Sequence, residues 1–580
     1  MIGVATSSQQ GALGDVQTFE YRQPIGNLRM PPMTEEDTFG VLPVIDEQIS
    51  QTSQRSIGCN PLQRWSERKL LILMNLLMIL AIVSSSIYMV ISTERDSQKK
   101  VHVVTLGFDR ETCKKVHDVD QVLNSTLLCN CLATEDFWNL TLDKVYDELK
   151  ADLSGWFQFS TDLNKTDCMV ENIALAWIAL EIEKLNGVKK SFSFPRLKTR
   201  FFLTSFYLHL GGSDWIQNTN WTTSYSECDW FGVRCAKNGT LESLNLSDNL
   251  LQGQLMENNL ASLESLQHLD LSYNMIHGVL PGDLWNNYNL VTIDLRNNSI
   301  SGQIPSSPTY DNEKRFLPIE TIDFGRNSLS GTIPENLGLF MTNLINLELS
   351  SNLLEGTIPT FEGMTTLKSI SLSLNPLNGT IPNSLANLRH LERLDLTFIK
   401  FDSGSIPSTI GKLGKLKVLK LTSSTFTGSL PNGFVNLTSL QVFDASGSFL
   451  TGTIPEGIKH LTNIEIFLVN GTYTDGSIPS EIGQCTNLSV LSVWFTELTG
   501  TLPSELGSLS LLEFLDVSKV SKLKGPIPTE IFDLPSLRFL NVAETKMSGV
   551  VPEYFCRKDE FIQVQFSPNQ NLNCSCCVMI

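Results

Sequence analysis

Residues 266–281, LQHLDLSYNMIHGVLP, decide the fold, because variants of this stretch recur throughout the C-terminal half of the chain. Each copy opens with the pattern L-x-x-L-x-L and ends with G-x-[ILV]-P or a variant of it. Successive markers are mostly 24 or 25 residues apart. A fixed period of this length is typical of a solenoid built from stacked repeats. The Gly of the marker stands at Gly253, Gly278, Gly302, Gly331, Gly356, Gly379, Gly404, Gly428, Gly452, Gly476, Gly500, Gly525 and Gly549.

The alternating Leu residues of one copy place one face of a short strand in the core. A single copy cannot bury that face, so neighbouring copies must stack and pair their strands. The Gly of the marker allows a backbone conformation that other residues resist, and the Pro that follows ends local ladder pairing. The sequence therefore predicts an α/β leucine-rich-repeat solenoid of about thirteen ~24-residue repeats with a concave parallel β-sheet.

The turn after the Leu pattern divides the repeats into two sets. The first six copies carry Asn there, and its side chain can satisfy backbone groups that the solenoid leaves unpaired. The last seven carry Ser, Thr or a β-branched aliphatic residue, and Ile399 and Val520 can donate no hydrogen bond. We therefore expect two halves that differ in curvature. The positions are Asn249, Asn274, Asn298, Asn327, Asn352 and Asn375, then Ile399, Ser424, Ser448, Thr472, Thr496, Val520 and Thr545.

The charge of the 580-residue chain excludes one class of partner. Lys plus Arg number 43 and Asp plus Glu number 61, which gives a net charge of −18. This charge would repel the phosphates of a nucleic acid, so we expect no nucleic-acid partner.

Residues 70–91, LLILMNLLMILAIVSSSIYMVI, form an uncharged apolar run. A bilayer core needs roughly 20 residues of helix, and a buried core helix of this length would normally show a polar face. The first 60 residues contain no apolar stretch long enough for a cleaved signal peptide. The run is therefore predicted to be a single transmembrane helix that acts as both targeting signal and anchor.

Positive charges flank this run almost equally on both sides, so they do not set its orientation. All twelve Asn-x-Ser/Thr sequons follow the run, and so do eleven of the twelve Cys residues. Glycans and disulfides form in the lumen or outside the cell. We therefore expect a single-pass type II protein of the plasma membrane, with a cytoplasmic N-terminus and extracellular or lumenal repeats. The main glycosylation candidates are Asn124, Asn139, Asn164, Asn220, Asn238, Asn378, Asn436 and Asn470, and the other sequons are at Asn245, Asn297, Asn487 and Asn573.

A helical region is expected between the span and the repeats, because residues 169–185 and 196–210 have apolar residues at helical spacing. Four Cys residues in this region, at 113, 129, 131 and 168, allow three disulfide pairings. The predicted segments are a disordered cytoplasmic tail (1–69), the transmembrane helix (70–91), a helical membrane-proximal region (93–210), an N-terminal cap (211–240), the leucine-rich repeats (241–555) and a Cys-rich C-terminal cap (556–580).

Residues 220–235, NWTTSYSECDWFGVRC, resemble the N-terminal cap of plant-type leucine-rich-repeat receptors. The shared pattern is a Trp followed by C-x-W-x-G-V-x-C, and the resemblance implies a disulfide between Cys228 and Cys235. The L-x-G-x-I-P repeats match the plant-type subclass. The Thr-rich turn position, the Ala-Leu-Ala-Trp segment at 174–177 and the Cys-rich ending look like those of diatom receptor-like proteins. The disulfide candidates are Cys228, Cys235, Cys556, Cys574, Cys576 and Cys577.

Two features depart from plant receptors. The apolar span precedes the repeats, whereas plant receptors usually have a cleaved signal peptide and a span after the repeats. No kinase Gly-rich loop or catalytic loop is visible in the sequence, so the resemblance is to receptor-like proteins without a kinase. A signal that crosses the membrane would therefore need a partner, such as a co-receptor kinase.

The exposed strand residues of such a solenoid line its concave face, where a ligand would bind. Asp recurs at one strand position and is interpreted there as the consensus of the repeat. Apolar residues expected to be exposed on this face are more informative, because such groups often mark interfaces. Packing against a neighbouring side chain or a glycan is the alternative, and Lys420 could pair with an anionic ligand or with Asp395 or Asp444. The ligand-binding candidates are Leu374, Phe398, Lys420, Leu468, Trp494 and Phe495.

The sequence favours a membrane-anchored recognition protein that binds a protein, peptide or glycan on the concave face. A structural role in attachment to an extracellular matrix or wall is the alternative, and a defined soluble ligand would distinguish the two. No H-E-x-x-H, phosphate loop, G-x-S-x-G or coherent Ser/His/Asp grouping is present, so we do not expect an enzyme. No two His residues have metal-ligand spacing, and we expect neither a metal nor a cofactor.

Overall fold

The computed structural model describes residues 125–132, 140–154, 168–184, 194–256, 260, 263–308, 316–402, 404–556, 563–567, 570–575 and 577–579. All of them belong to one compact unit, Thr105–Ile580. The predicted tail at 1–69, the predicted membrane span at 70–91 and the sequons at Asn124, Asn139 and Asn164 lie outside the described residues. Within the described ranges, no helix is both long and apolar enough to cross a membrane.

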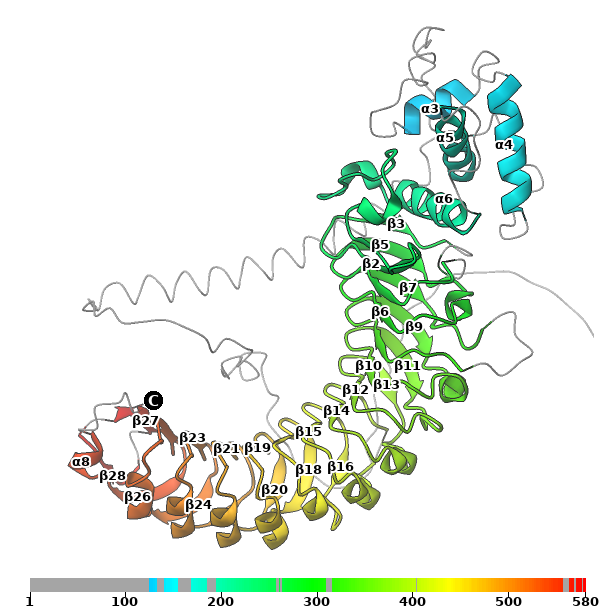
Figure 1. Cartoon of the computed structure of the whole chain (residues 1–580). Coiled ribbons are helices and arrows are strands. Elements are labelled where there is room, and N and C mark those ends of the chain that lie inside the picture. The colour runs from blue at the N-terminus through cyan, green and yellow to red at the C-terminus, as the bar shows by residue number, and fades with distance from the viewer. Residues whose placement is uncertain are drawn as a thin grey trace, which may run out of the picture. The chain divides into compact units, whose positions relative to one another are not determined.

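A 16-stranded sheet lines the inner side of the solenoid (Figure 1). Its strands, in spatial order, are β1 (Val233–Cys235), β2 (Leu241–Asn245), β4 (His268–Asp270), β6 (Thr292–Asp294), β8 (Thr321–Asp323), β10 (Asn346–Glu348), β12 (Ser369–Ser371), β14 (Arg393–Asp395), β15 (Val418–Lys420), β17 (Val442–Asp444), β19 (Ile466–Leu468), β21 (Val490–Ser492), β23 (Phe514–Asp516), β25 (Phe539–Asn541), β27 (Gln563–Phe566) and β29 (Val578–Met579). The β1–β2 pair is antiparallel, and all later pairs are parallel. Equivalent residues of successive repeats therefore lie side by side, which confirms the predicted parallel solenoid.

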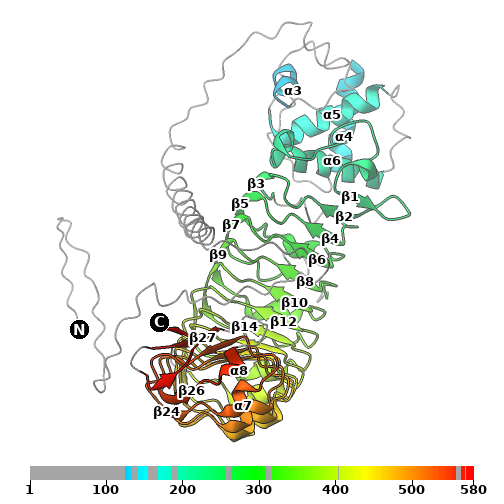
Figure 2. The same cartoon turned by 90° about the vertical axis from the view of Figure 1, so that its left-hand side faces the viewer.

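Shorter parallel ladders follow the turns after these strands. They contain β3 (Gln252–Gln254), β5 (Met275–Val279), β7 (Ser299–Gly302), β9 (Ser328–Thr332), β11 (Leu353–Thr357) and β13 (Leu377–Asn378); then β16 (Thr427–Gly428), β18 (Phe449–Thr453) and β20 (Tyr473–Asp475); then β22 (Thr499–Gly500), β24 (Lys522–Pro526), β26 (Lys546–Val550) and β28 (Leu572–Asn573). Figure 2 shows the successive repeats stacked one above another.

Short helices, mostly single 3-10 turns, return the chain to the next inner strand. Several begin directly after the marker Pro, as at Pro334 and Pro455, where the backbone is still extended. Pro has no N–H to donate and suits the position before a helix. These helices are η6 (Leu284–Asn286), η7 (Glu335–Leu339), η8 (Asn383–Asn387), η9 (Ser408–Lys412), η10 (Phe434–Asn436), η11 (Glu456–His460), η12 (Ser480–Gln484), η13 (Ser504–Ser508), α7 (Thr529–Phe532) and α8 (Glu553–Cys556).

The core is continuous along the solenoid, because the Leu positions of the repeat all face inward. Leu269 and Leu271 of the quoted stretch are at most 1% exposed. Neighbouring repeats share this core, as Phe443 and Phe467 do with ring centroids 5.4 Å apart. Each large buried side chain contributes about 1.5–3 kcal/mol relative to exposure, so a repeat gains most of its stability from its two neighbours.

The marker Gly serves two physical purposes. Gly356 and Gly379 have φ of +78° and +80°, in the left-handed region that side chains resist. A Cβ on Gly356 would lie 2.9 Å from Cγ2 of Thr332 in the preceding repeat, and one on Gly379 would lie 2.8 Å from Cγ2 of Thr357. The Gly therefore provides both the turn conformation and the space for the preceding repeat's Thr.

The two predicted halves differ in their hydrogen bonds between repeats. The Oδ1 atom of Asn274 accepts from the N–H groups of Asn249 and Leu251, 3.0 and 2.9 Å away, in the preceding repeat. Its Nδ2 donates to carbonyls of both repeats, including Leu246 at 2.9 Å. In the second half, Thr472 donates instead to Val469, three residues earlier in its own turn. The Asn positions thus join repeats, whereas several hydroxyl positions stabilise only their own turn.

Among the described residues, four α-helices precede the repeats, namely α3 (Ser125–Leu132), α4 (Leu140–Leu153), α5 (Val170–Lys184) and α6 (Phe194–His209). The last two correspond to the helical stretches expected at 169–185 and 196–210. A disulfide joins Cys129 to Cys168, and Cys131 is disulfide-bonded as well, so the structure selects among the pairings that the sequence left open. The short helices η4 (Gly212–Asp214) and η5 (Glu227–Asp229) lead into β1.

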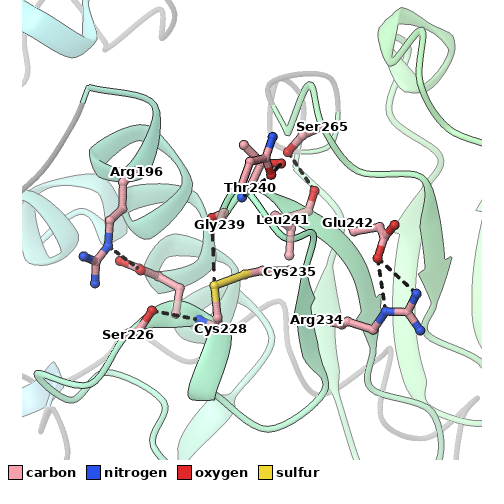
Figure 3. The surroundings of a disulfide bond; sticks show 12 residues. Arg196, Ser226, Cys228, Arg234, Cys235, Gly239, Thr240, Leu241, Glu242 and Ser265 are labelled. Atoms are coloured by element: carbon pink, nitrogen blue, oxygen red, sulfur yellow. Dashed lines mark hydrogen bonds and ion pairs between the residues drawn. A yellow bond between two sulfur atoms is a disulfide. The ribbon is translucent and has the colours of Figure 1, made fainter.

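A buried ion cluster connects helix α6 to the cap. Arg200 has no exposed surface, and its guanidinium lies within 2.9 Å of Glu181 and 2.8 Å of Glu227. Glu227 also accepts from Arg196 on α6 at 2.9 Å. Figure 3 shows Arg196 on one side of the Cys228–Cys235 disulfide, directly beside η5. Helices α5 and α6 and the cap are therefore held together by charge as well as by packing.

Candidate functional site

One column of residues on the inner sheet changes character along the solenoid. It is the strand position directly before the central buried residue, so its side chains point away from the core. In the first six strands from β4 the position is polar, and in the next six it is apolar and partly exposed. The polar residues are His268, Thr292, Thr321, Asn346, Ser369 and Arg393; the apolar ones are Val418, Val442, Ile466, Val490, Phe514 and Phe539. We call the second set the apolar column.

The apolar column is continuous, because its members are direct partners in the parallel ladder from β15 to β25. Phe514 and Phe539 stack face to face, with ring centroids 4.4 Å apart and an interplanar angle of 4°. The core of the same strands is filled by other residues, such as Leu491 and Leu515, which have no exposed surface. A run of six partly exposed apolar side chains on one face is typical of a binding surface.

Carboxylates border the apolar column on both sides. Glu465 and Glu513 immediately precede Ile466 and Phe514 and are exposed, whereas Asp444 lies two residues after Val442. The middle of the column, from β17 to β23, is therefore an apolar strip with an acidic margin. Such a surface favours ligands that combine apolar and cationic groups.

Trp494 and Phe495 extend this surface in the turn after β21. Both are partly exposed, and their ring centroids are 6.1 Å apart. The Nζ atom of Lys519 lies 5.9 Å from the Trp494 ring centroid, within the range of a cation–π contact. Burial raises the pKa of Asp516 on the neighbouring strand β23, where its side chain also accepts from the N–H of Ser518 at 2.9 Å.

The predicted ligand-binding residues do not form one site. Leu374 and Phe398 are 51% and 52% exposed, as expected, but they lie in turns after β12 and β14 rather than on the strands. Lys420 is partly buried on β15 between the register positions of Asp395 and Asp444. Of the six predicted residues, three lie beside the apolar column, namely Lys420, Trp494 and Phe495.

The prediction that Leu468 is exposed is wrong. Its strand register is as expected, because it pairs with Asp444 on β17 and with Ser492 on β21. The side chain is nevertheless only 4% exposed, and Ser492 is equally buried. Neighbouring repeats therefore cover this part of the inner face, and Leu468 offers little surface to a ligand.

The apolar column was not among the residues predicted from the sequence. The predicted candidates lie at the Asp position and in the turns, whereas the column occupies the second variable position of L-x-x-L-x-L. The signal was present in the sequence, because this position changes from polar to apolar between Arg393 and Val418. Aligning every copy by its central residue would have shown it.

The first half of the inner face is acidic instead. Asp294 on β6 lies beside Asp323 on β8 in the ladder, and Arg296 contacts them at 3.3 and 3.1 Å. Arg296 also lies 5.6 Å from the ring centroid of Tyr273. Burial raises the pKa of Asp294 to about 6, although the backbone N–H of Arg296 favours the charged form. Among the described residues, no group of three or more His, Cys, Asp or Glu could hold a metal ion.

The predicted glycosylation positions differ in how exposed their Asn side chains are. Asn238, Asn378 and Asn436 are exposed, whereas Asn220 and Asn470 are partly buried. The Nδ2 of Asn220 donates to the carbonyl of Asp229 at 2.8 Å, and the Oδ1 of Asn470 accepts from Ser446 at 2.9 Å.

The predicted Cys228–Cys235 disulfide is present, with 5.5 Å between the Cα atoms. Another disulfide joins Cys574 to Cys577, while Cys556 ends helix α8 and Cys576 lies outside the described residues. Cys485 is a free, buried cysteine, and burial raises its thiol pKa to about 11. Its thiol is therefore expected to be unreactive.

The family model for the Leucine Rich Repeat matches residues 265–287, 289–310 and 366–388. Receptor-like protein 6 of Arabidopsis thaliana is 29% identical over 233 residues, which are 30% of this chain and 23% of that protein. The chain contains leucine-rich repeats and is similar to plant receptor-like proteins.

Two further comparisons show the same similarity. Phytosulfokine receptor 1 of Arabidopsis thaliana is 37% identical over 95 residues, which are 16% of this chain and 9% of that protein. A solved structure described as a TDR receptor is 25% identical with a TM-score of 0.52, and covers 58% of this chain and 56% of that one. The chain thus matches only a small part of these curated relatives, so their whole activities do not transfer directly.

Proposed function

We propose that this leucine-rich-repeat protein is a recognition protein that binds a peptide segment along the apolar column. The observation that carries the proposal is the run of six apolar residues in ladder register from β15 to β25, partly exposed on the inner face. Five strand-to-strand steps of ~4.8 Å span about 24 Å, which matches an extended segment of about seven or eight residues.

A rigid sheet suits this role. The apolar column lies on strands whose backbone groups are already hydrogen-bonded to both neighbouring strands. Peptide binding would therefore cost little conformational entropy in the sheet. Trp494 and Phe495 would supply aromatic anchors at one margin, and Lys420 a cation near the other end. The earlier candidates Leu374, Phe398 and Leu468 do not belong to this surface.

We further propose that the protein is anchored by residues 70–91, with the repeats outside the cytosol and without a kinase of its own. The disulfides Cys129–Cys168, Cys228–Cys235 and Cys574–Cys577, which join described residues, support an oxidising compartment. One relative is by name a receptor, Phytosulfokine receptor 1, which supports a receptor-like role. Transmission of a signal would then use a membrane partner such as a co-receptor kinase.

The test is selection from a random library of linear peptides of about eight residues, on the full chain in detergent micelles. Binding of the selected peptides is then compared among wild type, Ile466→Asp and Val490→Asp. We expect a loss of about five- to tenfold or more for each variant, because a partly exposed aliphatic side chain gains about 1 kcal/mol on burial. Thr453→Asp, an exposed position on β18, is the matched control and should bind as wild type does.

Two results would reject the peptide proposal. One is equal binding by Ile466→Asp, Val490→Asp and wild type, which would place the peptides elsewhere. The other is retention of insoluble wall or matrix polysaccharide with no peptide selected, which would favour the alternative role in attachment. The proposed orientation is tested by expressing the chain with a tag at each end and treating intact cells with an enzyme that removes N-glycans. A gel shift, with only the C-terminal tag accessible at the cell surface, is the expected result.

A further inference from the structure

A second apolar surface lies on the edge of the inner sheet. The turn after each strand contains the Asn, Ser, Thr or Ile position described above. The residue directly before this position and the residue directly after it both point outward. We call these two rows, over the ten turns after β2 to β19, the turn edge. Its residue pairs, in chain order, are Asp248/Leu250, Tyr273/Met275, Asn297/Ser299, Arg326/Ser328, Ser351/Leu353, Leu374/Pro376, Phe398/Lys400, Ser423/Thr425, Gly447/Phe449 and Gly471/Tyr473.

Large apolar side chains are concentrated on the turn edge. Seven of them are between 42% and 58% exposed, and they alternate with polar turns rather than forming one block. Phe449 also stacks on Tyr473, with ring centroids 6.2 Å apart. The seven exposed residues are Leu250, Tyr273, Met275, Leu353, Leu374, Phe398 and Phe449.

Folding alone does not favour several of these residues. Tyr273, Leu374 and Phe398 have φ of +55°, +56° and +59°, in the left-handed region. A residue other than Gly costs roughly 1–2 kcal/mol there, and Gly or Asn is the usual choice, as at Gly447 and Asn297. Bulky residues here are both strained and exposed, so they impose two costs that a binding function would offset.

The order of residues along the turn edge is close to a palindrome. Reading inward from both ends, each of the two outermost turns on each side carries a large apolar residue, the third turn is polar, and the two central turns again carry apolar residues. The fourth turns differ, because one is Arg326/Ser328 and the other is Phe398/Lys400. A two-fold rotation reverses the order of turns, so in four of the five facing pairs of turns it would bring apolar turns against apolar ones or polar turns against polar ones.

The row that precedes the buried position is also complementary in size. Under the same reversal, large residues meet small ones or a cation meets a ring. The facing pairs would be Asp248 with Gly471, Tyr273 with Gly447, Asn297 with Ser423, Arg326 with Phe398, and Ser351 with Leu374.

We propose that two copies of this chain associate through their turn edges, about a two-fold axis between the turns after β10 and β12. The seven exposed side chains would each bury roughly 80–100 Å², or about 600 Å² together, and the polar turns between them add more. This approaches the ~800 Å² per partner of a standard interface. The contact uses a different surface from the apolar column and does not depend on the proposed peptide.

The charge pattern sets the length of this contact. Only three of the twenty turn-edge residues are charged, namely Asp248, Arg326 and Lys400. The next three turns carry four charges in six positions, namely Glu497, Lys519, Glu544 and Lys546, and the other two positions are Phe495 and Ser521. The apolar edge therefore ends at the turn after β19, which leaves the axis at the centre of ten turns.

Two predicted sequons lie at this edge. Asn297 is part of the polar third turn, and Asn378 is exposed on β13, two residues after Pro376 and on the same face of the strand. A glycan at Asn378 would hold the two copies apart at the centre of the contact. The inference therefore requires both Asn297 and Asn378 to be unmodified in the associated protein.

Sedimentation of the full chain in detergent micelles at micromolar concentrations tests the association. We expect a dimer for wild type, and at least tenfold weaker association for Leu374→Asp and for Leu353→Asp. Leu339→Asp is the matched control, because Leu339 is 65% exposed on η7, away from the turn edge. Ile466→Asp should lose peptide binding and still form the dimer. Peptide binding therefore tests the proposed function, and sedimentation tests the association, independently of each other.

Engineered cysteines test the two-fold register. Chains carrying Asn297→Cys should form a disulfide when mixed with chains carrying Ser423→Cys, and neither chain should do so alone. A monomer at all concentrations, a disulfide in Asn297→Cys alone, or a glycan on Asn378 in the dimer would each overturn the proposal. Equal association by wild type and Leu374→Asp would do so as well.

Discussion

Replacing Arg200 with Ala should detach the helical module from the repeats. All five N–H groups of its guanidinium have acceptors, namely both oxygens of Glu181, one oxygen of Glu227, and the carbonyls of Thr223 and Tyr225. Its Cζ lies 5.0 and 5.2 Å from the ring centroids of Trp177 and Trp230. Removing one partner of such a buried group typically costs about 3–5 kcal/mol.

The lower end of that range is the better expectation here. Glu227 would keep Arg196 as a partner at 2.9 Å, so its charge would not be left fully uncompensated. Arg200→Lys should lose about 1–2 kcal/mol, because an ammonium has three donors and cannot reproduce the planar fork. Lys417→Gln is the matched control, since its exposed pair with Glu392 should contribute at most about 1 kcal/mol.

Amide hydrogen exchange on the full chain measures this effect locally. We expect Arg200→Ala to lower the opening free energy of α5, α6 and the cap by about 3 kcal/mol, and to leave strands β17 to β25 unchanged, because repeats contact only their neighbours. A change of less than about 1 kcal/mol in α6 would refute the reasoning. Equal loss of protection along the whole solenoid would also refute it, since the effect would then be global.

Three further predictions concern the repeats. Asn274→Ala should lower the free energy of unfolding in urea by about 2–3 kcal/mol, because it leaves buried groups of two repeats unpaired. Thr472→Ala should lower it by about 1 kcal/mol, because Thr472 bonds within its own turn. Equal losses would contradict the difference between Asn turns and hydroxyl turns. Gly356→Ala should destabilise by at least 1 kcal/mol through its left-handed φ, and Thr332→Ser, which removes the close methyl group, should restore only part of it. The pKa of Asp294 is raised to about 6 in the folded state, so the folded chain binds a proton more readily than the unfolded chain does. The free energy of unfolding should therefore rise as the pH falls from above 6 towards 4. Asp294→Asn should remove this contribution, as measured by thermal unfolding.

Much of the fold could be predicted from the sequence because it is periodic. The alternation around Leu269 and the spacing of the marker Gly define the strand, its register and the direction of stacking, and the parallel ladder confirms them. The helices expected at 169–185 and 196–210 are present as α5 and α6 within a few residues. Disulfide pairing in the helical region was left open, because spacing alone cannot select among three pairings.

The candidate site was predicted less well, and the reason is local. The exposed turn residues Leu374 and Phe398 were recognised because the turn position is fixed by the repeat. Leu468 was assigned correctly to its strand face but wrongly to the surface, because its cover comes from neighbouring repeats about 24 residues away in either direction. The apolar column required comparison of one position across all copies rather than inspection of each copy.

By itself, the sequence determined the repeating unit, its plant-type character and the alternation that directs side chains inward or outward. These properties depend on patterns within about 25 residues, and they follow from backbone geometry. Only the tertiary structure decided which outward residues stay exposed and which charges become buried. Arg200 is fully enclosed because Glu181, Glu227 and two Trp rings converge on it from separate segments, and no local pattern around residue 200 encodes that convergence. Burial is set by the bulk of neighbours distant in the chain, which is why it emerges only when the repeats and helices are packed together.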